Sequence, residues 1–342
     1  MPSYEEIKTA FQWVSFFFSL CFNTLLIYLI LTKSPKKMGN YRYLMIYFSC
    51  FAIFFSTVDV VVGPYIHSHG KSFCVLADRR GSVVSETVEY ILITILCGCF
   101  GVTITFFAIH FVFRYFALER KGRLTYFHGW NFAIWLGIPV FFGALWGTTV
   151  GYLLAPTGET TEYLRQSILD SYNLTMDHVT YVGTLYWRQK EDGKEELVIE
   201  SLISILIFSS MITTSFSVVC YYGYLSYQRI TALMQEGESS YTKNLQRQLY
   251  KALVVQALIP IILMYFPVMN YLMLPAFGIN ISPFSQLITF LYAAYSAVDP
   301  LPLFFIIDNY RLALAEYCFF CPMPKNRVSY SEDEVSRNQT TI

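Results

Sequence analysis

Long stretches of the chain carry no charged side chain, and their lengths predict membrane-spanning helices. Charges are absent from residues 9–32, 43–58, 90–109, 124–158, 201–228 and 252–298. About 20 apolar residues cross the hydrocarbon core of a bilayer as a helix. The last stretch holds two such helices, because "LPAFGINISP" at 274–283 carries the prolines and the glycine of a turn. We therefore predict seven spans, at about 11–32, 43–63, 88–112, 130–154, 198–222, 252–274 and 285–307.

The composition and the distribution of charge favour a membrane protein with one orientation. Hydrophobic residues make up 55% of the chain and charged residues 14%, against about 45–50% and about 25% in soluble domains. Of the Lys and Arg in the loops, 16 lie on one side of the membrane and 8 on the other. When the long loop 155–197 is left out, the second side carries only 4. Loops rich in Lys and Arg face the cytoplasm, so the amino terminus is predicted outside and the carboxyl terminus inside. The net charge of zero gives no reason to expect a nucleic acid partner.

The chain is predicted to be one all-α, seven-helix domain over 1–322, followed by a disordered cytoplasmic tail over 323–342 that is polar and poor in apolar residues. After the last span, residues 308–320 are expected to form a short interfacial helix. Cys318 and Cys321 at its end are placed for palmitoylation, although two buried cysteines are an equal alternative. Asn173 begins an N-x-T sequon midway along the long outer loop and is a glycosylation candidate.

Several polar residues interrupt the apolar spans, where each ionisable group costs about 2.5–3.5 kcal/mol. In the last span Asp299 is directly followed by Pro300, and Asn23 lies in the middle of the first span. An amide and a carboxyl on neighbouring helices can hydrogen-bond directly or through water. Asp59 near the outer end of the second span either lines a ligand cavity or pairs with a histidine, His67 or His69, in the next loop. For all of these the alternative is that they only hold the helices together.

Motifs for catalysis, metal binding or nucleotide binding are missing from the sequence. It contains no H-E-x-x-H, G-x-S-x-G, P-loop or G-x-G-x-x-G motif, and its one C-x-x-C pair has no second pair to complete a metal site. We therefore expect no enzyme activity, no metal and no cofactor. An intramembrane aspartyl protease would need two facing carboxyls, and Asp59 and Asp299 are expected at different depths.

Five stretches in order along the chain resemble the nematode serpentine chemoreceptors of the str class, whose members include odorant receptors. They are "GNYRYLMIYFS", "GPYIHS", "IHFVFRYFAL", "LQRQLYKALVVQALIPIILMYFP" and "VDPLPLFFIIDNYR". The resemblance covers nearly the whole chain. It implies a G protein-coupled receptor that binds a small organic odorant, activates a heterotrimeric G protein and resides in the plasma membrane of a sensory cilium.

The sequence also differs from rhodopsin-like receptors at two familiar places. Arg114-Tyr115 resembles their Arg-Tyr pair, but Phe113 replaces the preceding acid. Asp299-Pro300 resembles their Asn-Pro pair in the last helix, but Leu303 stands where a tyrosine is expected. Pro300 frees a backbone carbonyl and weakens the last helix, and Asp299 supplies a polar partner. We therefore expect the pair to form a hinge with two arrangements, which an agonist biases by binding one of them better than the other. The predicted activation switch comprises Asn23, His110, Asp299 and Pro300.

A ligand site is expected between the outer halves of the third, fifth, sixth and seventh helices, where such bundles enclose a cavity. An aromatic lining with a few hydroxyls and amides suits a small neutral organic molecule better than an ion. For any single residue, packing of helix on helix is an equally good interpretation. The predicted ligand-binding residues are Asp59, Thr94, Cys97, Phe100, Ser204, Phe208, Tyr265, Met269, Gln286, Tyr292 and Tyr295.

On the cytoplasmic side, the basic segments after the third span and before the sixth are expected to contact the G protein. The candidates are Arg114, Tyr115, Arg247 and Lys251. A homo-oligomer or an accessory trafficking protein is a further expected partner. The main alternative function is a ligand-gated ion channel or transporter, although no span carries a charge series and no inverted repeat is visible.

Overall fold

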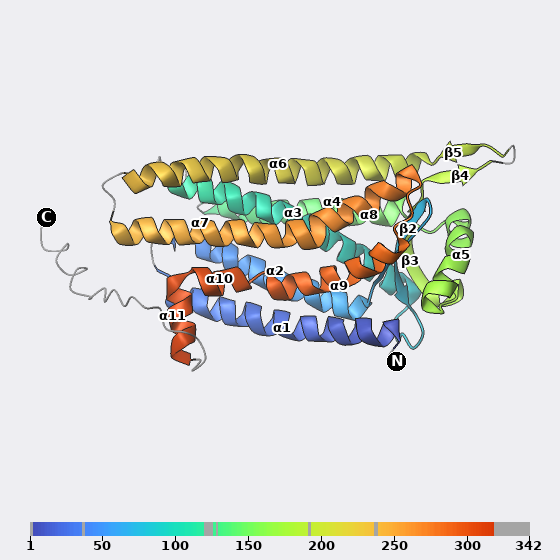
Figure 1. Ribbon diagram of the computed structural model, residues 1–342, viewed down its shortest axis with the longest axis horizontal. Coiled ribbons are helices and arrows are strands. Elements are labelled where there is room, and N and C mark those ends of the chain that lie inside the picture. Colours follow the sequence, from blue (N-terminus) through green and yellow to red (C-terminus); the bar gives the residue numbers. More distant parts are fainter. Residues whose placement is uncertain are drawn as a thin grey trace, which may run out of the picture.

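The computed structural model describes residues 3–35, 38–119, 126–127, 129–190, 193–235 and 239–317. Among these residues, seven helices are long and apolar enough to cross a membrane, and they run along the long axis of the molecule (Figure 1). The predicted seven-helix bundle is therefore confirmed. Its helices are α1 (Tyr4–Lys33), α2 (Tyr41–Val62), α3 (Glu86–Glu119), α4 (Trp130–Leu153), α6 (Ile199–Gln235), α7 (Ser240–Pro260) continued by α8 (Phe266–Met273), and α9 (Ser282–Val298) continued by α10 (Leu301–Ile306).

Helix α3 lies in the middle of the bundle, where it contacts α2, α4, α6 and α7. Its approach to α4 depends on glycines in both helices. A Cβ atom added at Gly98 of α3 would lie 2.8 Å from the backbone oxygen of Gly143 in α4. Only a residue without a side chain permits this backbone contact, as in small-residue interfaces of other membrane helices.

Prolines set the breaks in the sixth and seventh spans. In the sixth, a π-helical turn at Ile261–Tyr265 joins α7 to α8, and the Phe266 N–H bonds to the Ile261 carbonyl five residues earlier. Pro267 lacks an N–H and cannot continue the normal ladder there. In the seventh, α9 ends at Val298, and the Leu303 N–H bonds at 3.1 Å to the carbonyl of Pro300.

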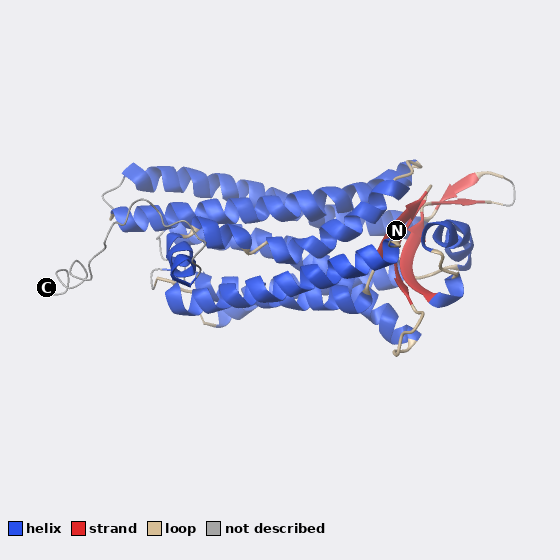
Figure 2. Cartoon of the chain, turned by 60° about the horizontal axis from the view of Figure 1, so that its bottom comes forward, coloured by secondary structure: helices blue, strands red, loops and turns tan. Residues whose placement is uncertain are grey.

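A small sheet covers the end of the bundle at which the chain begins (Figure 2). Its antiparallel strands, in the order β1-β2-β3, are β1 (Tyr65–His69), β2 (Ser72–Asp78) and β3 (Val179–Leu185). Helix α5 (Gly158–Tyr172) packs on its outer face, and a hairpin of β4 (Trp187–Gln189) and β5 (Glu195–Leu197) extends beyond it. These segments lie between the predicted spans, where only loops were expected, so the sheet and α5 are additions to the predicted helical fold.

The sheet is bonded to the outer ends of α8 and α9. The Tyr271 hydroxyl donates to the Cys74 carbonyl at 2.6 Å, and the Tyr186 hydroxyl donates to the Leu272 carbonyl at 2.7 Å. The backbone N–H of Ile66 donates to the Thr289 hydroxyl at 3.2 Å. These bonds hold the sheet as a lid over the space between the helices.

At the opposite end, α11 (Asp308–Tyr317) turns across the bundle after α10 (Figure 1). Its Tyr310 hydroxyl is 2.6 Å from the Ser34 hydroxyl after α1, and the Asp308 N–H donates to the Gln248 side-chain oxygen at 3.0 Å. This helix lies where the sequence predicts an interfacial helix. The palmitoylation candidates Cys318 and Cys321 and the tail 323–342 lie outside the described residues.

Candidate functional site

An apolar cavity of about 80 Å³ lies between the outer halves of the helices and directly beneath the sheet. Strands β1, β2 and β3 form its roof, and α3, α4, α6, α8 and α9 form its walls. The lining residues are Pro64, Ile66, Phe73, Val75, Leu96, Cys97, Phe100, Trp146, Val150, Leu154, Val182, Phe208, Val268, Tyr271, Leu272, Ile288 and Tyr292.

The polar groups of this lining are already engaged with the backbone. The Tyr271 hydroxyl donates to carbonyls of the sheet, and the Tyr292 hydroxyl donates to the Leu96 carbonyl at 3.3 Å. No charged side chain is among the described residues that line the cavity. A charged ligand would lose its hydration here without gaining a partner, whereas a neutral apolar ligand would not.

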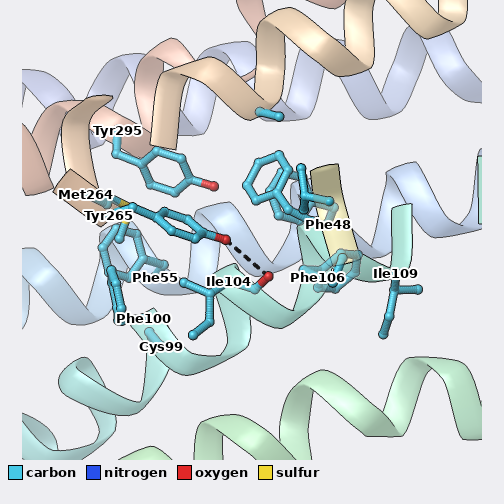
Figure 3. Packing of buried hydrophobic residues seen from close by; sticks show 14 of the residues in the cluster. Phe48, Phe55, Cys99, Phe100, Ile104, Phe106, Ile109, Met264, Tyr265 and Tyr295 are labelled. Carbon is cyan, nitrogen blue, oxygen red and sulfur yellow. Dashed lines mark hydrogen bonds between the residues drawn. The ribbon is translucent and has the colours of Figure 1, made fainter. Parts of the chain in front are cut away.

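Four predicted ligand-binding residues line this cavity, namely Cys97, Phe100, Phe208 and Tyr292. Tyr265 and Tyr295 are not in the lining but pack beside lining residues, and Figure 3 shows Tyr265 close to Phe100. The ring of Tyr265 is 6.1 Å from that of Phe100, and Phe55 packs between Tyr292 and Tyr295 at 4.9 and 6.1 Å. Helical spacing therefore predicted an aromatic group drawn from α3, α6, α9 and the π-helical turn.

Other predicted residues lie away from the lining. Asp59 is buried between α1 and α2, where its Oδ2 accepts from the Gln12 amide at 3.3 Å, and it pairs with neither His67 nor His69. Thr94 faces α4 and donates to the carbonyl of Ile91 in its own helix. The remaining members outside the lining are Ser204, which donates to the Ser201 carbonyl, half-buried Met269, and Gln286, whose carbonyl accepts from the Tyr4 hydroxyl.

The residues of the cavity roof were not predicted from the sequence. Ile66, Phe73, Val75 and Val182 come from three strands inside segments that were treated as loops. A signal was present, because two short runs rich in aromatic and β-branched residues flank Gly70, which has φ +52° in the turn. Such runs around a glycine-containing turn are typical of a β-hairpin.

Asn23 contacts the last span at the carbonyl that Pro300 leaves without a partner. Pro300 has no N–H, so the carbonyl of Ser296, four residues earlier, loses its helical bond. The Asn23 side-chain amide donates to this carbonyl at 3.1 Å. Asn23 therefore bonds to the backbone one turn before Asp299 rather than to the carboxyl that the sequence suggested.

The carboxyl of Asp299 is fully buried and contacts the sixth span. The Gln256 amide donates to the Asp299 carbonyl at 3.2 Å and to its carboxyl Oδ2 at 3.4 Å. Within the described residues, Asp299 Oδ1, the Tyr295 hydroxyl and the Ser296 hydroxyl are buried without a hydrogen-bond partner. Groups of this kind form alternative bonds when the helices move, so the geometry suits a hinge with two arrangements.

Between this region and the cavity, Tyr265 bonds across to α3. Its hydroxyl donates to the Ile104 carbonyl at 3.2 Å (Figure 3). The Ser215 hydroxyl of α6 donates to the same carbonyl at 2.6 Å. Because Tyr265 lies in the π-helical turn, a shift of the Phe100 ring against it would be transmitted to α7.

At the cytoplasmic end, Arg114 is buried and donates to the Gln246 carbonyl of α7 at 2.7 Å. His110, one turn earlier, packs against Phe48 and Phe106, with its Nδ1 at 3.5 Å from the Tyr41 hydroxyl. These contacts link the end of α3 to α2 and α7.

The other predicted G protein contacts differ in exposure. Tyr115 is half-buried, and its hydroxyl donates to the Glu119 carboxylate at 2.7 Å, whereas Arg247 and Lys251 are exposed one turn apart on α7.

The glycosylation candidate Asn173 is exposed at the end of α5, with φ +54°. Asparagine tolerates that conformation better than most residues do.

One titratable group in the lid has a strongly shifted pKa. Burial, and to a lesser extent the neighbouring His69, lower the pKa of His67 to about 4. Its ring nitrogens are 2.7 Å from the Ser167 hydroxyl and 3.3 Å from the Tyr172 hydroxyl of α5. His67 is therefore neutral at physiological pH and joins the sheet to α5 by hydrogen bonds.

Comparison with known proteins identifies the family. Residues 8–315 match the model of the serpentine-type seven-transmembrane chemoreceptor family Str. The chain is 33% identical to the G-protein coupled receptor str-217 of Caenorhabditis elegans, over 89% of this chain and 87% of that protein. It is 30% identical to serpentine receptor class r-10 of Caenorhabditis briggsae, over 96% and 95%, and 27% identical to the G-protein coupled receptor str-33 of Caenorhabditis elegans, over 91% of each.

These matches cover all seven spans, the lid and the cytoplasmic contacts described above. They confirm the resemblance read from the five sequence stretches, and they place the chain among membrane receptors rather than enzymes. The chain belongs to the Str family of serpentine seven-transmembrane G protein-coupled chemoreceptors.

Proposed function

We propose that this receptor binds a small neutral odorant in the cavity beneath the sheet and responds by activating a heterotrimeric G protein, as expected of an olfactory receptor. The observation that carries the proposal is the apolar cavity beneath the sheet, whose lining includes Cys97, Phe100, Phe208 and Tyr292. Such cavities with few polar groups are typical ligand sites of helix bundles.

The cavity supports a particular class of ligand. Its volume of about 80 Å³ is below the roughly 150 Å³ of an engineered apolar cavity that holds benzene. The hydroxyls of Tyr271 and Tyr292 already donate to backbone carbonyls. The proposed ligand is therefore compact, uncharged and mainly hydrocarbon, with at most a weak acceptor group.

The proposed signal passes from the cavity to the sixth and seventh spans. A ligand against Phe100 favours one position of Tyr265 and thereby of the π-helical turn. The hinge at Asp299-Pro300, held by Asn23 and Gln256, then changes its hydrogen bonds. An agonist drives this change only by binding one arrangement more tightly than the other.

The proposed outcome is an opening of the cytoplasmic face. Release of Arg114 from the Gln246 carbonyl exposes a guanidinium to the G protein beside Tyr115. Arg247 and Lys251 on α7 supply positive charge already at the surface. His110 belongs to the same switch, because its packing against Phe48 of α2 fixes α3 near Arg114.

The remaining features of the proposal concern the cell. The receptor is proposed to act in the plasma membrane of a sensory cilium, as a homo-oligomer or with an accessory trafficking protein. Glycosylation at exposed Asn173 fits its place on the outer side. Palmitoylation at Cys318 and Cys321 would hold the end of α11 at the inner membrane surface.

A second-messenger assay in cells expressing the receptor, screened with small neutral organic molecules, tests this function. We expect a response to a compact apolar compound that is lost in Arg114→Ala at equal surface expression. Arg188→Ala, in the outer β4–β5 hairpin, serves as the matched control and keeps the response. A ligand-gated current that survives both Arg114→Ala and G protein blockade would contradict the proposal and favour a channel.

A further inference from the structure

A second apolar crevice, of about 810 Å³, lies outside the ligand cavity between α3, α4 and α6. Buried Ala108 and Ile109 of α3 form its floor. Phe142 of α4 and Thr214 of α6 stand on opposite walls, and Thr214 is exposed. The lining lies in the half of the bundle that the Lys and Arg distribution assigns to the cytoplasm.

A stacked aromatic pair on α4 and α6 directly follows two lining residues of the crevice in the sequence. The rings of Trp146 and Phe208 are 4.2 Å apart at an interplanar angle of 27°. Both residues line the ligand cavity, while Leu145 and Ile207, their neighbours in the sequence, line the crevice. The two spaces therefore share a wall.

The crevice is apolar along its length and polar at one end. None of the described residues that line it is charged. The Thr105 hydroxyl is engaged with the Gly101 carbonyl and the Ser210 hydroxyl with the Ile207 carbonyl. At the cytoplasmic end, by contrast, the lining includes Tyr126 and Tyr222, whose side chains each carry a phenol hydroxyl, at the level where aromatic residues meet the membrane surface.

We propose that this crevice binds a sterol of the cytoplasmic leaflet. A rigid apolar ring system matches a deep crevice with aromatic walls, and its single hydroxyl matches the phenols of Tyr126 and Tyr222. The surrounding medium at this depth is lipid, so a membrane component fills the space rather than water. A phospholipid headgroup would require a cation to bind its phosphate, and the described lining offers none.

The site is placed to influence the ligand cavity. Ser215 lines the crevice and donates to the Ile104 carbonyl, to which Tyr265 also donates. Leu145 and Ile207 line the crevice, and the residues that follow them, Trp146 and Phe208, line the ligand cavity. A sterol packed against Ser215, Leu145 and Ile207 favours one arrangement of the ligand cavity and shifts agonist potency. This shift in potency rests on the proposed function, whereas sterol binding itself does not.

Two positions on α6 provide a matched test. Thr214 lines the crevice and is exposed, so tryptophan there fills the crevice without entering the core. Thr213 is equally exposed on the same helix but is not part of the lining. The full receptor and the variants Thr214→Trp and Thr213→Trp are placed in lipid nanodiscs with a photoactivatable sterol, without any odorant.

We expect the sterol to label peptides of α3, α4 or α6 in the wild type and in Thr213→Trp, and excess unlabelled sterol to remove the label. In Thr214→Trp the labelling falls by about tenfold or more. Ordinary sterol raises the thermal unfolding midpoint of the wild type and Thr213→Trp by about 3 °C, and this shift disappears in Thr214→Trp.

Three outcomes would overturn the proposal. Labelling that excess sterol does not remove, or that is equal in Thr214→Trp and Thr213→Trp, identifies the occupant as bulk phospholipid chains. Cross-links between two receptor copies through α4 and α6 identify the crevice as an oligomer interface. Because no odorant is present, none of these results depends on whether the proposed ligand cavity is correct.

Discussion

At the scale of single residues, polar side chains inside the bundle donate hydrogen bonds to backbone carbonyls that lack their usual helical partner near prolines. Asn23 supplies the Ser296 carbonyl with the partner that Pro300 cannot provide. The Asp299 carbonyl also lacks its helical partner, because the Leu303 N–H donates to the Pro300 carbonyl. The Gln256 amide donates to the Asp299 carbonyl in its place. Sequence alone identified Asn23 and Asp299 as unusual, but it did not give their partners, which depend on how each helix is rotated.

Replacing Asn23 tests this assignment. In Asn23→Ala the Ser296 carbonyl is left buried without a partner, and we expect the free energy of unfolding to fall by about 1–2 kcal/mol. Asn270→Ala is the control, because Asn270 is only half-buried and its amide donates to the Phe266 carbonyl of its own helix. Thermal unfolding in detergent micelles compares the two, and equal midpoints would refute the assignment.

His67 makes the lid sensitive to acid. Its pKa is about 4 in the folded receptor, whereas an unfolded histidine has about 6.5. Between these values the unfolded chain binds the proton and the folded lid does not, so stability is lost as the pH falls.

We expect the unfolding midpoint to drop more steeply between pH 6.5 and pH 4.5 in the wild type than in His67→Gln. His178, exposed at the start of β3, gives the control His178→Gln, which should keep the steep dependence of the wild type. A wild-type curve parallel to that of His67→Gln would show that this histidine does not set the acid sensitivity.

At the scale of elements, the charge-free stretches predicted where helices lie but not how far they extend. α6 continues to Gln235 and α7 begins at Ser240, beyond the hydrophobic spans. There, polar residues form helix outside the membrane, and hydropathy carries no signal for it. The sheet was missed because its strands are short and lie between strong membrane signals, although the hairpin around Gly70 was visible in the sequence.

The contact of α3 with α4 sets the cavity wall, and its glycines are testable. In Gly98→Ala the new Cβ meets the Gly143 carbonyl at 2.8 Å, so the helices must separate. We expect a loss of about 1–3 kcal/mol in the free energy of unfolding, with weaker surface expression. Gly137→Ala on α4 meets nothing within 4 Å and should be neutral or slightly stabilising.

At the scale of the whole molecule, the receptor is a bundle closed at its outer end by a sheet that is hydrogen-bonded to the sixth and seventh spans. Tyr271 and Thr289, in the sixth and seventh spans, bond the lid. Helical spacing and the seven-span topology led to four residues of the cavity. Sequence could not separate them from Thr94 or Ser204, because helix rotation is fixed by packing such as the approach of Gly98 to α4.

The most direct test of the account is agonist potency after the cavity is filled. Val150 is buried on α4 and lines the cavity, whereas Val140 is exposed on the same helix. With surface expression matched, we expect Val150→Phe to raise the agonist concentration for half-maximal second-messenger response by about tenfold or more, and Val140→Phe to leave it unchanged. Equal potency in both variants would contradict the account, because the ligand would then bind elsewhere.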